Sequence, residues 1–169
     1  TFAAVRSRYA VHKVRTIILA AASRTESALA GVSECAKNAA LLCIHDGARC
    51  FVTPEIVEDA VHTAALHFAA APAVPLRDTV KRAENGVVTE TPPREELFAV
   101  QTPQVFRADL IKAALTRAVE QGLSYTDDCA AAEALGVPVH LSRGREENIK
   151  RTTPAARAVA AALLKRRGE

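Results

Sequence analysis

Short runs of apolar residues alternate along this chain with longer segments in which apolar residues recur at helical spacing. The runs at residues 14–21, 39–45 and 71–76 (VRTIILAA, AALLCIH and APAVPL) predict buried strands. Shorter strands are expected at 97–100 and 137–141. Strands that alternate with helical segments are typical of an α/β layer architecture.

Polar residues that favour helix starts precede several of the helical segments. Ser23 and Glu26 have the spacing of a capping box, in which each side chain bonds a backbone N–H of the other residue. Thr53-Pro54 places an N-cap threonine before a first-turn proline, and the predicted helix extends to about residue 70. The same pair at Thr153-Pro154 predicts the last helix. Further helices are expected at 108–121 and 128–135.

The polar segment between residues 77 and 94 carries a strong hairpin signal, Asn85-Gly86, with predicted arms at 80–84 and 87–91. A hairpin with so few large apolar residues is not stable alone, so we expect it to lie on this subunit or on a second copy. The preceding strand at 71–76 is entered at a proline, which predicts that its first residues lie at a sheet edge.

The composition narrows the class of protein. The 169 residues and 18.0 kDa fit one domain, 1–169, with 49% hydrophobic and 24% charged residues. With 35 alanines and only 4% aromatics, the chain suits helices packed on a sheet rather than a stacking platform for nucleic acid. The net charge of +3 is mild and suits an anionic small molecule as well as a polyanion.

The chain contains no apolar stretch of about 18 residues, and its charged start lacks the apolar centre of a signal peptide. We therefore expect a cytoplasmic protein that binds neither membranes nor nucleic acid. Four cysteines (Cys35, Cys43, Cys50 and Cys129) have neither CxxC spacing nor a nearby histidine pair. This pattern predicts reduced thiols rather than a zinc site or disulfides.

Asp46 is the first candidate for chemistry because it directly follows the predicted strand 39–45. Ligands gather at the carboxyl ends of strands in open parallel sheets, where a carboxylate can hold a divalent metal or a ribose hydroxyl. An aspartate before Gly47 is equally typical of a simple turn. Arg49 can bind an anion or pair with Asp46.

Lys150 is the second candidate, since it lies close to the predicted helix start at Thr153-Pro154. A lysine beside free backbone N–H groups suits a phosphate, although a solvated lysine in a basic loop is the simpler interpretation. Thr126-Asp127-Asp128 precedes a helix, where acidic residues are stabilising anyway. The polar stretches 76–81 and 101–104 offer hydroxyls at a strand end and a turn, respectively.

Other common active-site patterns are missing from the sequence. The histidines form no constellation: His62 and His67 fall on different faces of one helix, and His12, His45 and His140 stand alone. The sequence has no GxSxG nucleophile elbow, no GxGxxG and no GxxxxGK[ST] phosphate loop.

Five short motifs, taken together, resemble the 2-C-methyl-D-erythritol 4-phosphate cytidylyltransferases of non-mevalonate isoprenoid biosynthesis. They are IHDGAR (44–49), VPLRDTVKR (74–82), VQTPQVF (100–106), YTDD (125–128) and GREENIKRTTP (144–154). Upstream, residues 20–32 (AAASRTESALAGV) are similar to the family segment that has a glycine pair, an arginine and Ser-Val. The resemblance extends from about residue 14 to 160 and implies a three-layer Rossmann-like nucleotidyltransferase fold, with a mostly parallel sheet and a projecting hairpin arm.

The resemblance also implies a reaction and roles for individual residues. In the family, a substrate phosphate attacks the α-phosphorus of CTP and pyrophosphate leaves. Asp46 is then expected beside the α-phosphate and Mg²⁺, and Lys150 and Arg94 are expected to position the attacking phosphate. The nucleotide would contact Ala21, Ala22, Ser27, Asp46, Gly47 and Ala48, and the polyol phosphate would contact Thr79, Arg94, Thr102, Asp127 and Lys150.

Family members are dimers in which a hairpin arm embraces the partner, which assigns residues 78–97 to a dimerisation arm. Three departures from the family pattern stand out. Alanines replace the glycine pair, Gly47 and Cys50 replace an alanine and a proline, and nothing before Thr16 resembles the family's first strand and glycine-rich nucleotide loop. We therefore expect an upstream coding segment to supply that strand and loop.

Two alternatives remain open from the sequence. Ribitol-5-phosphate cytidylyltransferase is the near relative, and the stretch 78–81 (DTVK) favours the methylerythritol enzyme over it. The absent nucleotide loop is also compatible with a catalytically inactive, dimeric binding or regulatory protein.

Overall fold

Alternate residues of the central strands point to opposite faces of one sheet in the computed structural model, which describes residues 2–9 and 11–168. On strand β2 (Ala69–Pro75), Ala69 and Ala71 pack on one face and Ala70 on the other. Phe106 and Val105 divide in the same way on the neighbouring strand β6 (Gln104–Arg107). Both faces are therefore buried, which gives the three-layer α/β arrangement that the resemblance implied.

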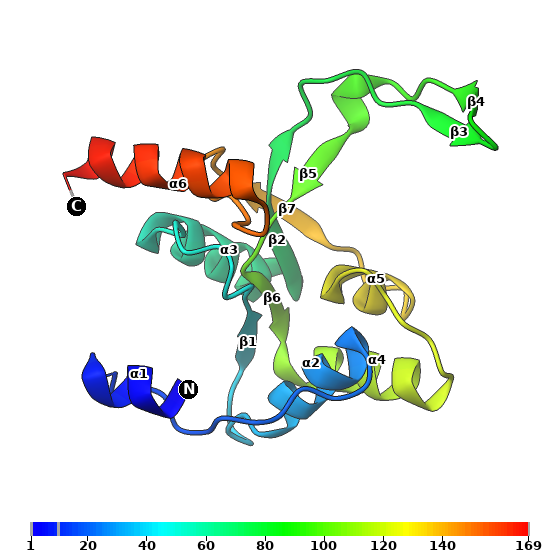
Figure 1. Cartoon of the computed structure of the whole chain (residues 1–169). Coiled ribbons are helices and arrows are strands. Elements are labelled where there is room, and N and C mark those ends of the chain that lie inside the picture. Colours follow the sequence, from blue (N-terminus) through cyan, green and yellow to red (C-terminus); the bar gives the residue numbers. More distant parts are fainter. Residues whose placement is uncertain (1, 10, 169) are drawn as a thin grey trace.

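Helices and strands alternate along much of the chain, and in space the helices surround a central sheet (Figure 1). Their order is α1 (Phe2–Arg8), α2 (Arg24–Ser33), β1 (Leu41–Ile44), α3 (Pro54–His67), β2, β3 (Arg82–Glu84), β4 (Val87–Glu90), the 3₁₀ helix η1 (Arg94–Glu96), β5 (Phe98–Val100), β6, α4 (Ala108–Glu120), α5 (Asp128–Glu133), β7 (His140–Arg143) and α6 (Pro154–Arg167).

The five-stranded sheet has the order β1-β6-β2-β5, with β7 beside β2. Strands β1, β2 and β7 point in one direction because β6 lies antiparallel to both β1 and β2, and β7 is parallel to β2. The prediction of a mostly parallel sheet therefore holds for strand direction, since β1, β2 and β7 outnumber β5 and β6. Only the β2–β7 ladder is itself parallel, because β6 is inserted between β1 and β2.

The two faces of the sheet have cores of different size. Helices α2, α4 and α5 cover the larger core, in which Phe106, Ile111 and Leu115 are almost completely buried. Helix α3 covers the other face with Ala60 and Ala64, whose small side chains let the helix approach the strands closely. The high alanine content of the sequence thus has a direct packing explanation.

Local signals in the sequence correctly predicted several element boundaries. Ser23 and Glu26 form the expected capping box of α2, and Thr53 and Thr153 are the N-caps of α3 and α6. Asn85 and Gly86 have φ angles of 51° and 80°, as a type I′ turn requires. They join β3 to β4 in a hairpin that projects away from the sheet (Figure 1).

Two strand predictions were wrong, in both cases because strand formation depends on neighbouring strands. Residues 14–21 form no strand, and Leu19 is 92% exposed, because no described strand lies beyond β1 to pair with them. The strand 71–76 is central rather than at an edge, with Pro72 placed where β2 passes from β6 to β5. Strand β6, between the turn expected at 101–104 and the helix expected from 108, was not predicted.

Candidate functional site

Two loops, 46–49 after β1 and 148–151 before α6, meet at the carboxyl end of β1. The Asp46 Oδ2 atom lies 3.1 Å from the Lys150 Nζ atom and 3.4 Å from the Arg49 Nε atom. Arg49 Nη1 donates a hydrogen bond of 2.8 Å to the Asn148 carbonyl, and Arg151 N donates one of 2.8 Å to the Ala48 carbonyl. The two strongest candidates from the sequence therefore share one site.

Asn148 fixes the second loop, and sequence reasoning did not assign it a role. Its side chain is fully buried, and Nδ2 donates to the Gln101 side-chain oxygen at 3.1 Å and to the Thr102 carbonyl at 3.0 Å. Gln101 in turn holds both main-chain groups of Arg145. These bonds place Lys150 against Asp46 and leave half of the lysine side chain exposed to a ligand.

His45 and Thr102 orient the backbone of Asp46. The Thr102 hydroxyl accepts a hydrogen bond from Asp46 N at 3.1 Å and lies 2.8 Å from His45 Nδ1. His45 Nε2 is 3.2 Å from the Arg49 carbonyl, which can only accept, so Nε2 carries the proton and Nδ1 accepts the hydroxyl proton of Thr102. His45 is thus hydrogen-bonded, as expected for an isolated histidine, and Thr102 can only accept from a ligand.

The site combines one carboxylate with two cations, so its local charge is positive and suits an anion. A cavity of about 340 Å³ opens beside Arg49 and Lys150, with its other wall at the base of the arm around Pro75 and Arg77. A groove of about 290 Å³ lies between Ser27 of α2 and His45, the residue before Asp46. The segment 45–49 therefore contributes His45 to one space and Arg49 to another, and the two spaces can hold separate ligands.

Of the three nucleotide-binding residues predicted near α2, Ser27 lies at that groove, and Ala21 is hydrogen-bonded to it. Ser27 lines it, and the Ser27 hydroxyl accepts a hydrogen bond of 2.9 Å from Ala21 N while donating one to the Ser23 carbonyl. Ala21 and Ala22 are exposed residues, and the Ala21 N–H is already used by the Ser27 hydroxyl. Gly47 and Ala48 belong to the loop that carries Asp46.

Asp127 has a structural role in addition to the one proposed for it. Its Oδ1 atom caps α5 by accepting from Ala130 N at 3.0 Å, and its Oδ2 atom accepts from the buried Gln104 amide at 2.9 Å. The Gln104 carbonyl oxygen accepts from Asp128 N and Cys129 N, which completes the start of α5. Gln104 was missed because its contacts are distant in sequence.

Arg24 ties α2 to α5 through a bidentate ion pair with Asp128. Its two terminal nitrogens lie 2.9 and 2.6 Å from the carboxylate oxygens, and the Asp128 side chain is 1% exposed. The hydrogen bonds that Arg24 donates to Asp128 raise the pKa of the guanidinium above its usual value, against the opposing effect of burial. The pair links the segment around Ser27 to the segment around Asp127.

Two of the predicted site residues lie elsewhere in this subunit. Thr79 and Arg94 are exposed on the segment 78–97, and Arg94 Nη1 donates a hydrogen bond to the Arg77 carbonyl at 3.0 Å. This segment projects from the sheet (Figure 1). The described part of one subunit therefore assembles Asp46, Thr102 and Lys150, with Ser27 across the groove, but does not add the arm residues.

The family model and the curated proteins that match this chain all carry the same name. The family model described as 2-C-methyl-D-erythritol 4-phosphate cytidylyltransferase matches residues 4–166. Curated proteins of that name from Halalkalibacterium halodurans and Desulforamulus reducens are 44% and 45% identical over 158 and 157 residues. These alignments cover 94% and 92% of this chain, and 69% and 67% of the relatives.

Solved structures show the same similarity in three dimensions. The crystal structure of 2-C-methyl-D-erythritol 4-phosphate cytidylyltransferase from Thermus thermophilus superposes with a TM-score of 0.80 at 30% identity, covering 91% of this chain and 79% of that one. The 4-diphosphocytidyl-2C-methyl-D-erythritol synthase from Anaerococcus prevotii gives a TM-score of 0.86 at 25% identity, covering 98% and 78%. Among the described residues, no helix is long and apolar enough to cross a membrane.

Proposed function

Because the chain belongs to the 2-C-methyl-D-erythritol 4-phosphate cytidylyltransferase family, we propose that it transfers a cytidylyl group from CTP to 2-C-methyl-D-erythritol 4-phosphate in isoprenoid precursor biosynthesis. The observation that carries the proposal is the contact of Lys150 and Arg49 with Asp46, in a segment from which His45 lines one cavity and Arg49 lines another. This arrangement suits two phosphate-bearing substrates that meet at one point.

In this reaction a phosphate oxygen of the polyol phosphate attacks the α-phosphorus of CTP. A new oxygen–phosphorus bond forms, the bond between the α-phosphorus and the bridging oxygen breaks, and pyrophosphate leaves with the electron pair. Such a transfer depends on alignment and on neutralisation of charge. Lys150 and Arg49 provide positive charge on the side where the attacking phosphate would lie, and Asn148 holds Lys150 in place.

A divalent metal fits this site only if the protein and the substrate hold it together. Among the described residues, no three histidine, cysteine, aspartate or glutamate side chains are grouped closely enough to hold a metal ion. Mg²⁺ in nucleotide sites often takes one or two carboxylates and completes its shell with phosphates and water, and Asp46 can supply that carboxylate. When bound there, Mg²⁺ would neutralise charge on the triphosphate of CTP.

The two spaces assign the remaining site residues either to the nucleotide or to the polyol phosphate. The groove at Ser27 would take the cytosine, with Ala21 and Ala22 at its edge, and Gly47 and Ala48 would face the ribose. The cavity at Lys150 would take the polyol phosphate, and the Thr102 hydroxyl, which does not line the cavity, would contact it from beside His45. Asp127 would contact the polyol phosphate while both of its carboxylate oxygens keep the hydrogen bonds from Ala130 N and Gln104.

Thr79 and Arg94 are proposed to act across a homodimer. Both lie on the exposed 78–97 arm, and the arm carries exposed apolar side chains such as Val87 and Val88, which are 68% and 55% exposed in one subunit. Apolar groups on a projecting hairpin are stabilised when a second chain covers them. In such a dimer the arm would bring Arg94 to the partner's polyol phosphate.

Pyrophosphate release with CTP and each of two polyol phosphates tests the proposal. We expect turnover with 2-C-methyl-D-erythritol 4-phosphate and at least tenfold lower kcat/KM with ribitol 5-phosphate. Turnover with ribitol 5-phosphate alone would overturn the substrate assignment. Calorimetry that shows polyol phosphate binding without CTP binding or turnover would instead support a binding or regulatory protein.

A further inference from the structure

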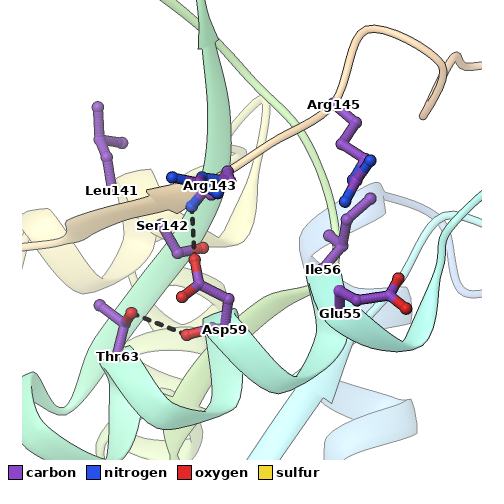
Figure 2. Close-up of a pocket in the computed structure, with 8 residues that line it drawn as sticks. All are labelled: Glu55, Ile56, Asp59, Thr63, Leu141, Ser142, Arg143 and Arg145. Atoms are coloured by element: carbon purple, nitrogen blue, oxygen red, sulfur yellow. Dashed lines mark hydrogen bonds between the residues drawn. The ribbon is translucent and has the colours of Figure 1, made fainter.

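A cavity of about 670 Å³ lies between α3 and β7, and it shares no lining residue with the two spaces of the candidate active site (Figure 2). Glu55, Ile56 and Asp59 of α3 form one wall, and Ser142 and Arg143 of β7, with Arg145 after it, form the other. The volume is that of a typical small-molecule site.

Two guanidinium groups at this cavity form no close ion pair. Among the described residues, neither Arg143 nor Arg145 is ion-paired. The Asp59 carboxylate accepts instead from the main-chain N–H of Arg143 at 2.7 Å (Figure 2). The charge of Arg145 acts on the Glu55 carboxylate, while the Gln101 side chain holds the main chain of Arg145 and leaves its exposed guanidinium without a hydrogen bond to the described residues.

Ser142 adds a second and independent sign of a ligand. The residue is only 8% exposed and lies at the cavity wall between Asp59 and Arg143, and its hydroxyl has no hydrogen-bond partner among the described residues. A buried hydroxyl without a partner costs free energy that a bound group can recover. The Oγ atom is shielded from solvent, so a ligand at this wall gains a hydrogen bond that the free protein lacks once a small shift of the wall exposes the hydroxyl.

The side chains around the cavity indicate what kind of ligand it takes. Arg143 and Arg145 offer planar donor groups that match phosphate oxygens. Glu55 and Asp59 on the opposite wall offer carboxylate oxygens that accept from hydroxyl groups. We propose that the cavity between α3 and β7 binds a phosphate monoester that carries free hydroxyl groups, at a site separate from the candidate active site.

The binding test uses the Lys150→Gln protein, in which we expect phosphate binding at the candidate active site to be weakened. Glycerol 3-phosphate is titrated while amide signals of residues 141–145 are followed by NMR. We expect saturable shifts at these amides, roughly tenfold or more weaker affinity in Arg145→Gln, and loss of saturation when Arg143→Gln is added. Arg157→Gln, which removes an exposed positive charge from α6, should leave the affinity unchanged.

Two further experiments identify the ligand and separate effects on binding from effects on folding. Inorganic phosphate should bind several-fold more weakly than glycerol 3-phosphate, whereas equal affinity would assign the site to free phosphate and refute the hydroxyl contacts. Ser142→Ala should weaken binding by roughly two- to fivefold without lowering the Tm, since the hydroxyl has no partner in the free protein. Absence of saturable shifts at millimolar concentration, or binding unaffected by Arg145→Gln, would overturn the proposal.

Discussion

The Lys150 ammonium and the Asp46 carboxylate meet at 3.1 Å, and half of the lysine side chain stays exposed to the cavity beside it. Lys150→Gln should therefore lower turnover by about 10²–10³, since it removes a positive charge aimed at the attacking phosphate. The free energy of unfolding should change by less than about 0.5 kcal/mol, because the pair is partly exposed. Steady-state kinetics and urea unfolding measure the two effects.

A matched control for this substitution is Lys165→Gln, which removes an exposed lysine near the end of α6. It should leave turnover unchanged. Turnover of the Lys150→Gln protein at the level of the unaltered protein would show that Lys150 does not position a reacting phosphate.

The ion pair between Arg24 and Asp128 should contribute to stability more than a surface pair does. Arg24→Gln leaves a carboxylate that is 1% exposed without its cation, and we expect a loss of about 2 kcal/mol, less than for a wholly buried pair because Arg24 is 39% exposed. Arg107→Gln, which breaks an exposed pair with Asp109, should cost about 0.5 kcal/mol or less. Equal losses in urea unfolding would contradict this assignment.

These results show which parts of the fold can be predicted from local sequence. Thr53-Pro54 and Asn85-Gly86 specify their helix start and turn through backbone preferences that act within a few residues. The run 14–21 has the composition of a strand but forms none, because a strand depends on hydrogen bonds to a neighbour. Pro72 was misjudged for the same reason, since its neighbours change along β2.

The candidate site divides in a similar way. Asp46 and Lys150 were identified because a strand end and a helix start are visible in the sequence, and the structure brings them together. Asn148 and Gln101 were not assigned roles, because a buried amide network depends on contacts between distant segments. The sequence shows which amides are present but not which of them are buried.

The Cys129 thiol should make the protein less stable at alkaline pH. Burial, together with nearby carboxylates, raises the pKa of this thiol above its usual value. An unfolded cysteine ionises near pH 8.5, so above about that pH the folded state binds more protons and the free energy of unfolding falls, by up to about 1.4 kcal/mol per pH unit. Urea unfolding between neutral and alkaline pH measures this slope.

Cys129→Ala should reduce that slope, whereas Cys50→Ala, at an exposed free thiol, should not. An unchanged alkaline slope in the Cys129→Ala protein would assign the loss of stability to other groups.

Gly144 should not tolerate a side chain, because its backbone lies against β2. A Cβ atom there would be 2.7 Å from the Ala73 carbonyl oxygen, so Gly144→Ala should cost about 1–3 kcal/mol. Gly31→Ala is the matched comparison inside α2, where the nearest atom is 3.9 Å away. It should stabilise by about 0.5–1 kcal/mol through helix propensity, and a stable Gly144→Ala protein would contradict the packing of β7 on β2.

The central claim is that the site around Asp46 joins the α-phosphorus of CTP to the phosphate of 2-C-methyl-D-erythritol 4-phosphate. Phosphorus-31 NMR of the reaction tests it most directly, because it identifies which phosphorus is transferred. The account predicts two coupled signals of an unsymmetrical diphosphate together with free pyrophosphate, and neither of them in the Asp46→Asn protein. Transfer of a different phosphorus, product formation by Asp46→Asn at an unchanged rate, or the absence of any product would contradict it.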